Sequence, residues 1–392
     1  MSFKTYTKIF LISIAFTIWS CKKDTQFAVN EIACELDYST HPNHTKYQTI
    51  LDDYTQKGIT GLTVVISTPE NGYWTGSSGF SNIEDNQKMN PCHLHHTASL
   101  AKSFTGIVTL QLIEEGKLGI DDLIGQYLSE EIKNYVPNVE KLTVKHLLQQ
   151  TSGIPDVFDL AFFETLMNAP EATYTTTDFF AMIEGRPAQF EPGEKHQYAD
   201  LNFNLLALII DEIEGDHKKS FSDRIFIPLG LEDIYYHNGD YPRPNGLVAS
   251  YWDQYNNGQI ENISDFQILM TNYIEASDGI ISSPKEMVRF YDAVFNGELV
   301  GVEMLHLIET DWVTEPDQNR MNTGYTHGFM SIDDDGQWIG HTGSHIGASC
   351  YVYHNLDTDA TIGVFTNTGV HFFTEKKALI YYHLWNDLRN AL

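Results

Sequence analysis

The chain has 392 residues, 42% of them hydrophobic, which is enough to bury the core of one large domain or of two closely packed ones. It carries 24 Lys and Arg against 53 Asp and Glu, a formal net charge of −29 at pH 7. Because such an anionic surface repels phosphate backbones and anionic lipid headgroups, the composition argues against nucleic-acid binding and against electrostatic adsorption to a membrane.

The first 20 residues have the pattern of a secretory signal. Two lysines precede an apolar run at residues 9–19, which is shorter than the ~20 residues of a membrane-spanning helix. The run leads into Ile18-Trp19-Ser20-Cys21, which resembles a bacterial lipobox. We therefore expect residues 1–20 to be removed, Cys21 to carry a lipid, and this anchor to be the only membrane contact of a bacterial envelope protein. An ordinary cleaved signal with an unrelated cysteine is the alternative.

Residues 21–44 are polar and aperiodic, so we expect a linker between the anchor and a body that spans residues 45–392. Apart from Cys21, the chain contains Cys34, Cys92 and Cys350. Three is an odd number, so the sequence predicts no complete disulfide framework. Cys34 lies in the expected linker, and we expect Cys92 and Cys350 to behave as small hydrophobic side chains.

The body begins and ends with strand patterns. Asn71-Gly72 predicts a hairpin between the β-rich segments 61–67 and 73–80. Strand patterns return at 349–354 and 361–365, before an amphipathic helix from about 374 to 392, whereas short helical patterns fill about 117–270. This order predicts an α+β fold, in which helices flank one sheet and a mostly helical subdomain is inserted. The cleft between the two parts is the natural place for a ligand.

Two helices of the body have recognisable ends. The pattern from Leu201 to Glu214 is followed by Gly215, a typical helix stop. In Ser283-Pro284-Lys285-Glu286, Ser283 fits the N-cap, Pro284 the first helical position and Glu286 the third residue of a capping box.

A further helix is expected to begin at or near Ser99. Ser99 and Lys102 would then share one helix face, where a desolvated lysine could take the proton of the serine hydroxyl. Backbone N–H groups at the helix start could hold a developing oxyanion. By itself Ser-x-x-Lys is a common pattern, and its ordinary interpretation is an N-cap serine beside a solvated lysine.

Two later motifs make the pattern more specific. Tyr198-Ala199-Asp200 directly precedes one predicted helix, and a tyrosine near a lysine can share its proton transfers. His341-Thr342-Gly343-Ser344 precedes the C-terminal strands, and a glycine-containing strand can present a backbone N–H to a carbonyl oxygen.

These motifs, in this order, resemble those of the serine β-lactamase and penicillin-binding protein superfamily, on its class C side, over about residues 45–390. Residues 142–155, 191–194 and 278–284 are similar to further stretches of that family. The resemblance implies a β-lactamase/transpeptidase-like fold with an antiparallel sheet of about five strands, and no metal or organic cofactor.

The resemblance also implies roles for individual residues. Ser99 would be the acylated nucleophile, and Lys102 and Tyr198 would transfer its proton. The backbone N–H groups of Ser99 and Ser344 would form the oxyanion hole. The remaining motif residues would bind substrate, namely Asp200, His341, Thr342 and Gly343.

Two positions depart from the family pattern. His341 stands where β-lactamases commonly have Lys, so we expect a partly cationic group and a weaker, pH-dependent recognition of a substrate carboxylate. Asp200 stands where Asn is frequent. If it lies near Lys102, its charge would favour the ammonium form and transfer more of the base role to Tyr198.

The sequence thus predicts a serine hydrolase that acts through an acyl-enzyme on a small acyl, peptide or ester substrate, either as a D,D-carboxypeptidase-like peptidase or as an esterase. The alternatives are a class C-type β-lactamase and a non-catalytic penicillin-binding-like module. The physiological substrate and the oligomeric state do not follow from the sequence.

Overall fold

The structure is a computed structural model that describes residues 32–169, 172–236, 246–253, 258–314, 324–332, 337–369 and 375–392. The expected signal peptide and Cys21 lie outside these ranges. Within them, no helix combines the length and apolar character needed to cross a membrane.

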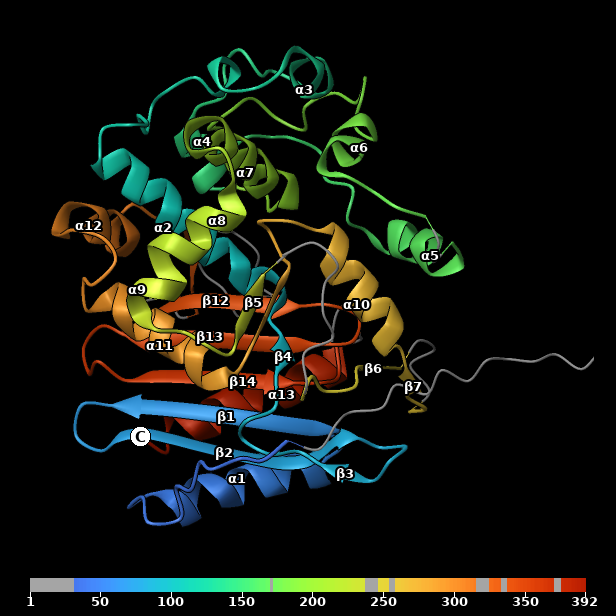
Figure 1. Cartoon of the computed structure of the whole chain (residues 1–392), viewed down its shortest axis with the longest axis vertical. Coiled ribbons are helices and arrows are strands. Elements are labelled where there is room, and N and C mark those ends of the chain that lie inside the picture. The colour runs from blue at the N-terminus through green and yellow to red at the C-terminus, as the bar shows by residue number, and fades with distance from the viewer. Residues whose placement is uncertain are drawn as a thin grey trace, which may run out of the picture.

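An antiparallel sheet forms the centre of the molecule, as expected from the sequence, and it has nine strands (Figure 1). Its five long strands are β2 (Gly72–Asn82), β1 (Gly61–Thr68), β14 (Thr361–Thr366), β13 (Ser349–Asn355) and β12 (Trp338–Ser344), in that spatial order. Four short strands widen it beyond the expected five: β3 (Gln87–Lys88) at one edge, and β11 (Phe329–Ser331), β10 (Gly324–Thr326) and β9 (Val313–Thr314) at the other.

The two ends of the chain meet in the middle of this sheet. β1 pairs with β14, with Val64 opposite Val364, and both strands are buried. β1 also pairs with β2 in the predicted hairpin, whose turn places Gly72 at a φ of 69°. Glycine adopts this left-handed conformation without the steric cost that a side chain brings.

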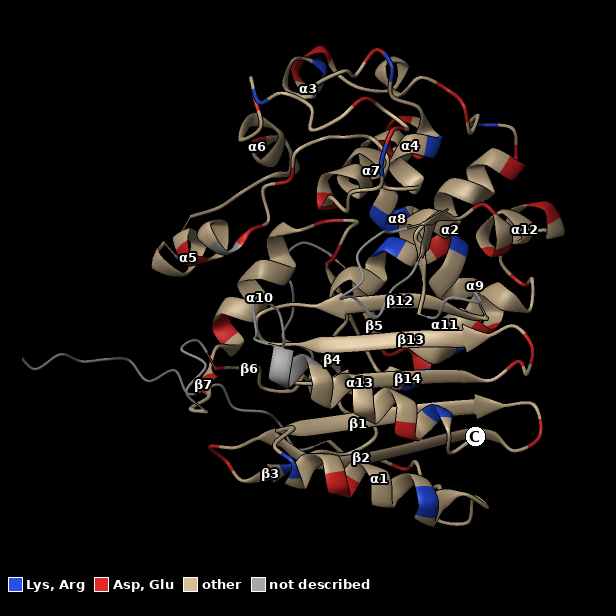
Figure 2. Ribbon diagram, turned by 180° about the vertical axis from the view of Figure 1, so that it is seen from behind, with Lys and Arg blue, Asp and Glu red and all other residues tan. Residues whose placement is uncertain are grey.

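Helices cover both faces of the sheet. α1 (His44–Gln56) and α13 (Glu375–Arg389) pack together on one face, where Trp385 contacts Trp338 edge to face. α11 (Pro284–Phe295) covers the opposite face against β1, β13 and β14, and α2 (Ala101–Glu114) lies beside it. Figures 1 and 2 show these two layers from opposite sides.

The middle of the chain supplies most of the remaining helices. They are α3 (Glu130–Tyr135), α4 (Val144–Leu148), α5 (Leu160–Asn168), α6 (Thr176–Ala181), α7 (Asp200–Glu214), α8 (His217–Phe221), α9 (Ile227–Leu229), α10 (Ser264–Tyr273) and α12 (Val302–Thr310). Short turns of 3-10 or π type are η1 (Ala98–Leu100), η2 (Ile124–Gln126) and η3 (Ser222–Phe226). Two small sheets join β4 (His95–His96), β8 (Ile280–Ser282) and β5 (Ile234–Tyr236), and β6 (Tyr251–Trp252) with β7 (Glu261–Asn262).

The predicted helix ends are largely confirmed. α7 stops at Gly215, which has a left-handed φ of 90°. Ser283 caps α11 by accepting the backbone N–H of Glu286, and Pro284 is the first helical residue. The predicted capping box is only half formed, because Glu286 accepts the backbone N–H of Glu232 at 2.6 Å instead of returning to the cap.

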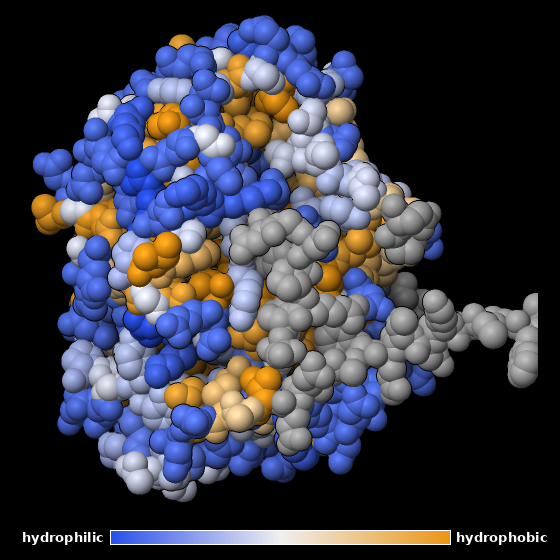
Figure 3. All heavy atoms as spheres, in the orientation of Figure 1, coloured by the Kyte–Doolittle hydropathy of each residue, from blue (hydrophilic) through white to orange (hydrophobic). Residues whose placement is uncertain are grey.

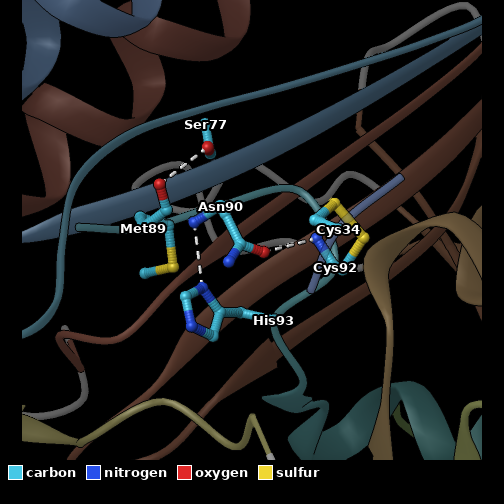
Figure 4. The surroundings of a disulfide bond; sticks show 6 residues. All are labelled: Cys34, Ser77, Met89, Asn90, Cys92 and His93. Carbon is cyan, nitrogen blue, oxygen red and sulfur yellow. Dashed lines mark hydrogen bonds between the residues drawn. A yellow bond between two sulfur atoms is a disulfide. The ribbon is translucent and has the colours of Figure 1, made fainter. Parts of the chain in front are cut away.

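A disulfide joins Cys34 to Cys92, with Cα atoms 5.5 Å apart (Figure 4). The expectation that Cys92 behaves as a small hydrophobic residue is therefore wrong. The turn that carries Cys92 is held by Asn90, whose side chain accepts the Cys92 N–H and whose own N–H donates to His93. Cys350 is a buried free thiol, as expected.

The surface is polar and acidic. Figure 2 shows Asp and Glu on helices and turns around the molecule, with fewer Lys and Arg, and Figure 3 shows one face that is mainly hydrophilic with scattered apolar groups.

Candidate active site

The candidate nucleophile lies in a tightly held turn. Ser99 is in η1, which continues directly into α2, so the predicted helix start is confirmed. Ala98 has a φ of 46°, a left-handed conformation that is uncommon for a residue with a side chain. Thr97 anchors the turn to β8, because its N–H and its hydroxyl both donate to the carbonyl of Ile280, at 3.1 and 2.9 Å.

Lys102 is completely buried and has three acceptors around its Nζ. Nζ lies 3.0 Å from Oγ of Ser99 and 2.8 Å from the carbonyl oxygen of Ser277, and it forms an ion pair with Oδ1 of Asp200. An ammonium group has three N–H donors and no acceptor. The three acceptors match the three donors of an ammonium group, and Asp200 does lie beside Lys102, as the sequence argument assumed.

Tyr198 and Asp200 are positioned by the start of α7. The N-cap, Ala199, has no side chain that could cap the helix. Two side chains from the loop after α4 replace it. Oε1 of Gln150 accepts the N–H of Ala199 at 3.0 Å, and Oδ2 of Asp156 accepts the N–H of Asp200 at 2.8 Å. These roles were not predicted from the sequence, because the cap comes from a distant segment.

Strand β12 lies directly against the nucleophile turn. A Cβ on Gly343 would lie 2.3 Å from the carbonyl oxygen of Thr97 and 3.2 Å from Cβ of Ala98, so only glycine permits this approach. Ser344 follows Gly343 and pairs with Ser349 at the end of the strand. The Ser344 hydroxyl is buried and has no hydrogen-bond partner among the described residues, whereas Thr342 donates to the sulfur of Met330 at 3.4 Å.

His341 differs from its predicted state. Its side chain is completely buried, with Nδ1 2.6 Å from the carbonyl oxygen of Thr342 and Nε2 3.4 Å from the hydroxyl of Tyr325. Burial, together with the charge of Lys102, lowers the pKa of His341 to about 3. The prediction of a partly cationic His341 is therefore wrong, because the imidazole is neutral at any pH near 7. The neighbouring Tyr325 was not identified from the sequence.

Burial and nearby carboxylates also perturb Tyr198. Burial first, and then the charge of Asp200, raise the pKa of Tyr198 well above its usual value, although a hydrogen bond with Ser99 partly opposes the shift. The phenol is thus protonated at neutral pH. The expectation that Asp200 transfers the base role to Tyr198 does not hold for the resting site, because the same carboxylate disfavours the phenolate.

Two further carboxylates flank the lysine. Burial, followed by the charge of Asp200, raises the pKa of Asp156 to about 7. Burial would also raise the pKa of Asp278, but an ion pair with His345 and a bond from the Gly279 N–H outweigh it, so the pKa is lowered. The Asp278–His345 pair connects the segment after Ser277 to the residue that follows Ser344.

Among the described residues, one cluster has potential ligand atoms close enough together to share a metal ion. It consists of Asp211, Asp216 and His217. Oδ1 of Asp211 already contacts His217 twice: it accepts the backbone N–H at 2.6 Å and lies 2.8 Å from the ring Nδ1. None of the three contacts Ser99 or Lys102, and no role in the candidate site follows.

An antiparallel sheet flanked by helices, with Ser99 and Lys102 at the start of a central helix, defines a protein of the β-lactamase/transpeptidase fold. The family described as Beta-lactamase matches residues 46–383, so the chain belongs to that family.

Individual relatives are more distant. "Protein flp" of Staphylococcus aureus (strain MW2) is 28% identical over 212 residues, which cover 54% of this chain and 42% of that protein. "Penicillin-binding protein 4*" of Bacillus subtilis (strain 168) is 24% identical over 341 residues, 82% of this chain and 71% of that protein. The match thus spans less than half the length of the staphylococcal relative.

Among solved structures, D-amino acid amidase from Ochrobactrum anthropi SV3 superposes with a TM-score of 0.77 at 20% identity, over 89% of this chain and 99% of the amidase. At this identity the likeness shows the fold and leaves the substrate open.

Proposed function

We propose that the protein is a serine hydrolase that forms an acyl-enzyme at Ser99 and cleaves an amide or ester bond. The observation that carries the proposal is the 3.0 Å contact between Nζ of Lys102 and Oγ of Ser99 at the start of α2. Tyr198 completes the group through its hydrogen bond with the Ser99 hydroxyl. A nucleophile in contact with both members of a proton-transfer pair is the arrangement that acyl transfer requires.

In the proposed reaction, Lys102 first releases one proton to solvent by way of the partly exposed Asp200 carboxylate. Its neutral amine then takes the Ser99 proton as Oγ attacks the carbonyl carbon, while Tyr198 is hydrogen-bonded to the same hydroxyl. The backbone N–H groups of Ser99 and Ser344 stabilise the oxyanion, and Gly343 allows the two backbone segments to approach each other. The proton then goes to the leaving amine or alkoxide, the acyl–leaving group bond breaks, and water releases the acyl group from Ser99.

The neutral His341 bears on the choice between peptidase and esterase. A D,D-carboxypeptidase must hold the terminal carboxylate of its peptide, and a neutral imidazole offers no charge for that purpose. An ester, or an amide without a terminal carboxylate, therefore fits the described site better. β-Lactams also carry a carboxylate, so the same argument ranks β-lactamase activity second.

The test is to incubate the purified protein separately with p-nitrophenyl acetate and with a penicillin, and to follow its intact mass, with Ser99→Ala as the control. We expect an acetyl adduct that requires Ser99 and turns over. A long-lived penicilloyl adduct would favour a penicillin-recognising peptidase, and rapid drug loss would favour a β-lactamase. If Ser99 reacts with neither compound, the non-catalytic alternative replaces this proposal.

A further inference from the structure

We propose that Asp200 is a specificity residue, and that its carboxylate binds a protonated amine on the acyl part of the substrate. The substrates would then be amides or esters of acids that carry a free amino group. This inference rests on the proposed function of Ser99, and it names the substrate class for that site.

The first observation is the free oxygen of Asp200. Its Oδ1 pairs with Lys102, but no described donor bonds to Oδ2. The Asp200 side chain remains 19% exposed, whereas that of Lys102 is 0% exposed. Of this ion pair, only the carboxylate is accessible to a ligand, and both it and Oγ of Ser99 contact Nζ of Lys102.

The second observation is that the backbone of Asp200 is fixed before any ligand arrives. Its N–H donates to Asp156 at 2.8 Å, and Asp156 is itself held by the N–H of Val157 at 2.8 Å. A group with a fixed backbone and one oxygen already engaged loses little freedom when it binds a cation.

The third observation is the balance of charge. Asp156, Asp200 and Asp278 surround Lys102, and His345 pairs with Asp278. Among the described residues, no other Lys or Arg bonds to Ser99, Tyr198, Asp200, His341 or Ser344.

His341 and Tyr198 are both neutral and add no charge of either sign, and Asp156, with a pKa of about 7, is only partly ionised at neutral pH. Because Asp200 is the exposed member of its ion pair with Lys102, the charged group that a ligand meets is a carboxylate. Such a site attracts an ammonium group and repels a carboxylate, which makes the charge of the substrate a basis for selection.

The test compares one substrate with and without its charge. Both enantiomers of alanine p-nitroanilide would be assayed beside their N-acetyl derivatives, which differ in lacking the ammonium group. We expect kcat/KM for the free amine to exceed that for the N-acetyl compound by about tenfold or more for at least one enantiomer. A ratio at or below one for both enantiomers would overturn the inference.

Asp200→Asn keeps the size of the side chain and removes its charge. We expect the ratio of free amine to N-acetyl substrate to fall at least about fivefold in this variant. The matched control is Asp357→Asn, which removes the same charge from an exposed residue in the turn at the other end of β13. The control should keep the wild-type ratio, and an unchanged ratio in Asp200→Asn would count against the inference.

The failure of this inference can be told apart from the failure of the proposed function. If p-nitrophenyl acetate acylates Ser99 but the free-amine substrates show no preference or no cleavage, only the role of Asp200 is rejected. If no compound acylates Ser99, the proposed function is rejected as well.

Discussion

Asp156 shows how a carboxylate outside the predicted motifs can control those motifs. It caps α7 from another loop and lies close enough to Asp200 for the two charges to interact. Its pKa of about 7 means that it is largely protonated in the folded protein at pH 5, whereas an unfolded aspartate is ionised there. Folding therefore takes up a proton between about pH 4 and pH 7.

Asp156→Asn tests this interpretation through the pH dependence of stability. For a carboxyl group whose pKa is raised by folding, stability is lost as the pH rises from the unfolded towards the folded pKa. Asparagine avoids this loss and still offers an oxygen to the N–H of Asp200. Relative to wild type, the variant should thus gain roughly 1–3 kcal/mol of unfolding free energy between pH 5 and pH 8.

Urea unfolding at the two pH values measures this gain, with the exposed Asp357→Asn as the control for a general charge effect. If the unfolding free energy of the variant differs from that of wild type by the same amount at pH 5 and pH 8, Asp156 acts only as a hydrogen-bond acceptor and does not titrate in this range.

At the scale of elements, the site depends on the close approach of β12 to η1. Gly343 lies at the point of contact, and a methyl group there would lie 2.3 Å from the carbonyl oxygen of Thr97 and 2.7 Å from Sγ of Cys350. Backbone atoms of a strand and a helix start cannot yield easily. Any side chain at Gly343 must therefore push the two elements apart.

Gly343→Ala should consequently lower the unfolding free energy by about 1–3 kcal/mol. It should also slow acylation of Ser99 by about a hundredfold, because the two expected oxyanion donors lie on the elements that separate. Urea unfolding and p-nitrophenyl acetate turnover measure the two effects. Gly125→Ala is a suitable control, since its Cβ would meet nothing closer than the 3.8 Å of the Val139 carbonyl oxygen. A fully active Gly343→Ala variant would refute this account of the contact.

Local elements were the part of the structure that the sequence predicted well. The hairpin at Asn71-Gly72, the stop at Gly215 and the cap at Ser283 depend on neighbouring residues, whose types carry the signal. The cap of α7 could not be predicted in this way. Its acceptors, Gln150 and Asp156, precede the helix by more than 40 residues, and only the folded chain brings them together.

In the candidate site, too, features that depend on neighbouring residues were predicted and features that depend on distant residues were not. The spacing of Ser99 and Lys102 predicted their contact, because both lie within one helical turn. The state of His341 could not be predicted, since its residue type suggests a partial charge while its burial beneath Tyr325 and Tyr198 removes it. Protonation depends on tertiary surroundings, which a motif does not describe.

For the whole molecule, strand patterns at the two ends of the chain correctly predicted one sheet. The pairing of Cys34 with Cys92 escaped notice because an odd number of cysteines gave no preferred partner. Their sequence separation of 58 left no local signal either. Disulfides persist in oxidising compartments. We therefore propose that the protein is exported to an oxidising compartment, in keeping with the secretory-signal pattern of residues 1–20.

The Cys34–Cys92 bond should contribute about 2–4 kcal/mol to stability, because it restricts a loop of this length in the unfolded chain. Urea unfolding of Cys34→Ser/Cys92→Ser against wild type measures this contribution. A reducing agent should destabilise the wild type and leave the double variant unchanged, since Cys350 has no disulfide partner. In protein isolated from the envelope, alkylation should reach Cys34 and Cys92 only after reduction. Alkylation of both without reduction would contradict the bond and remove its support for export.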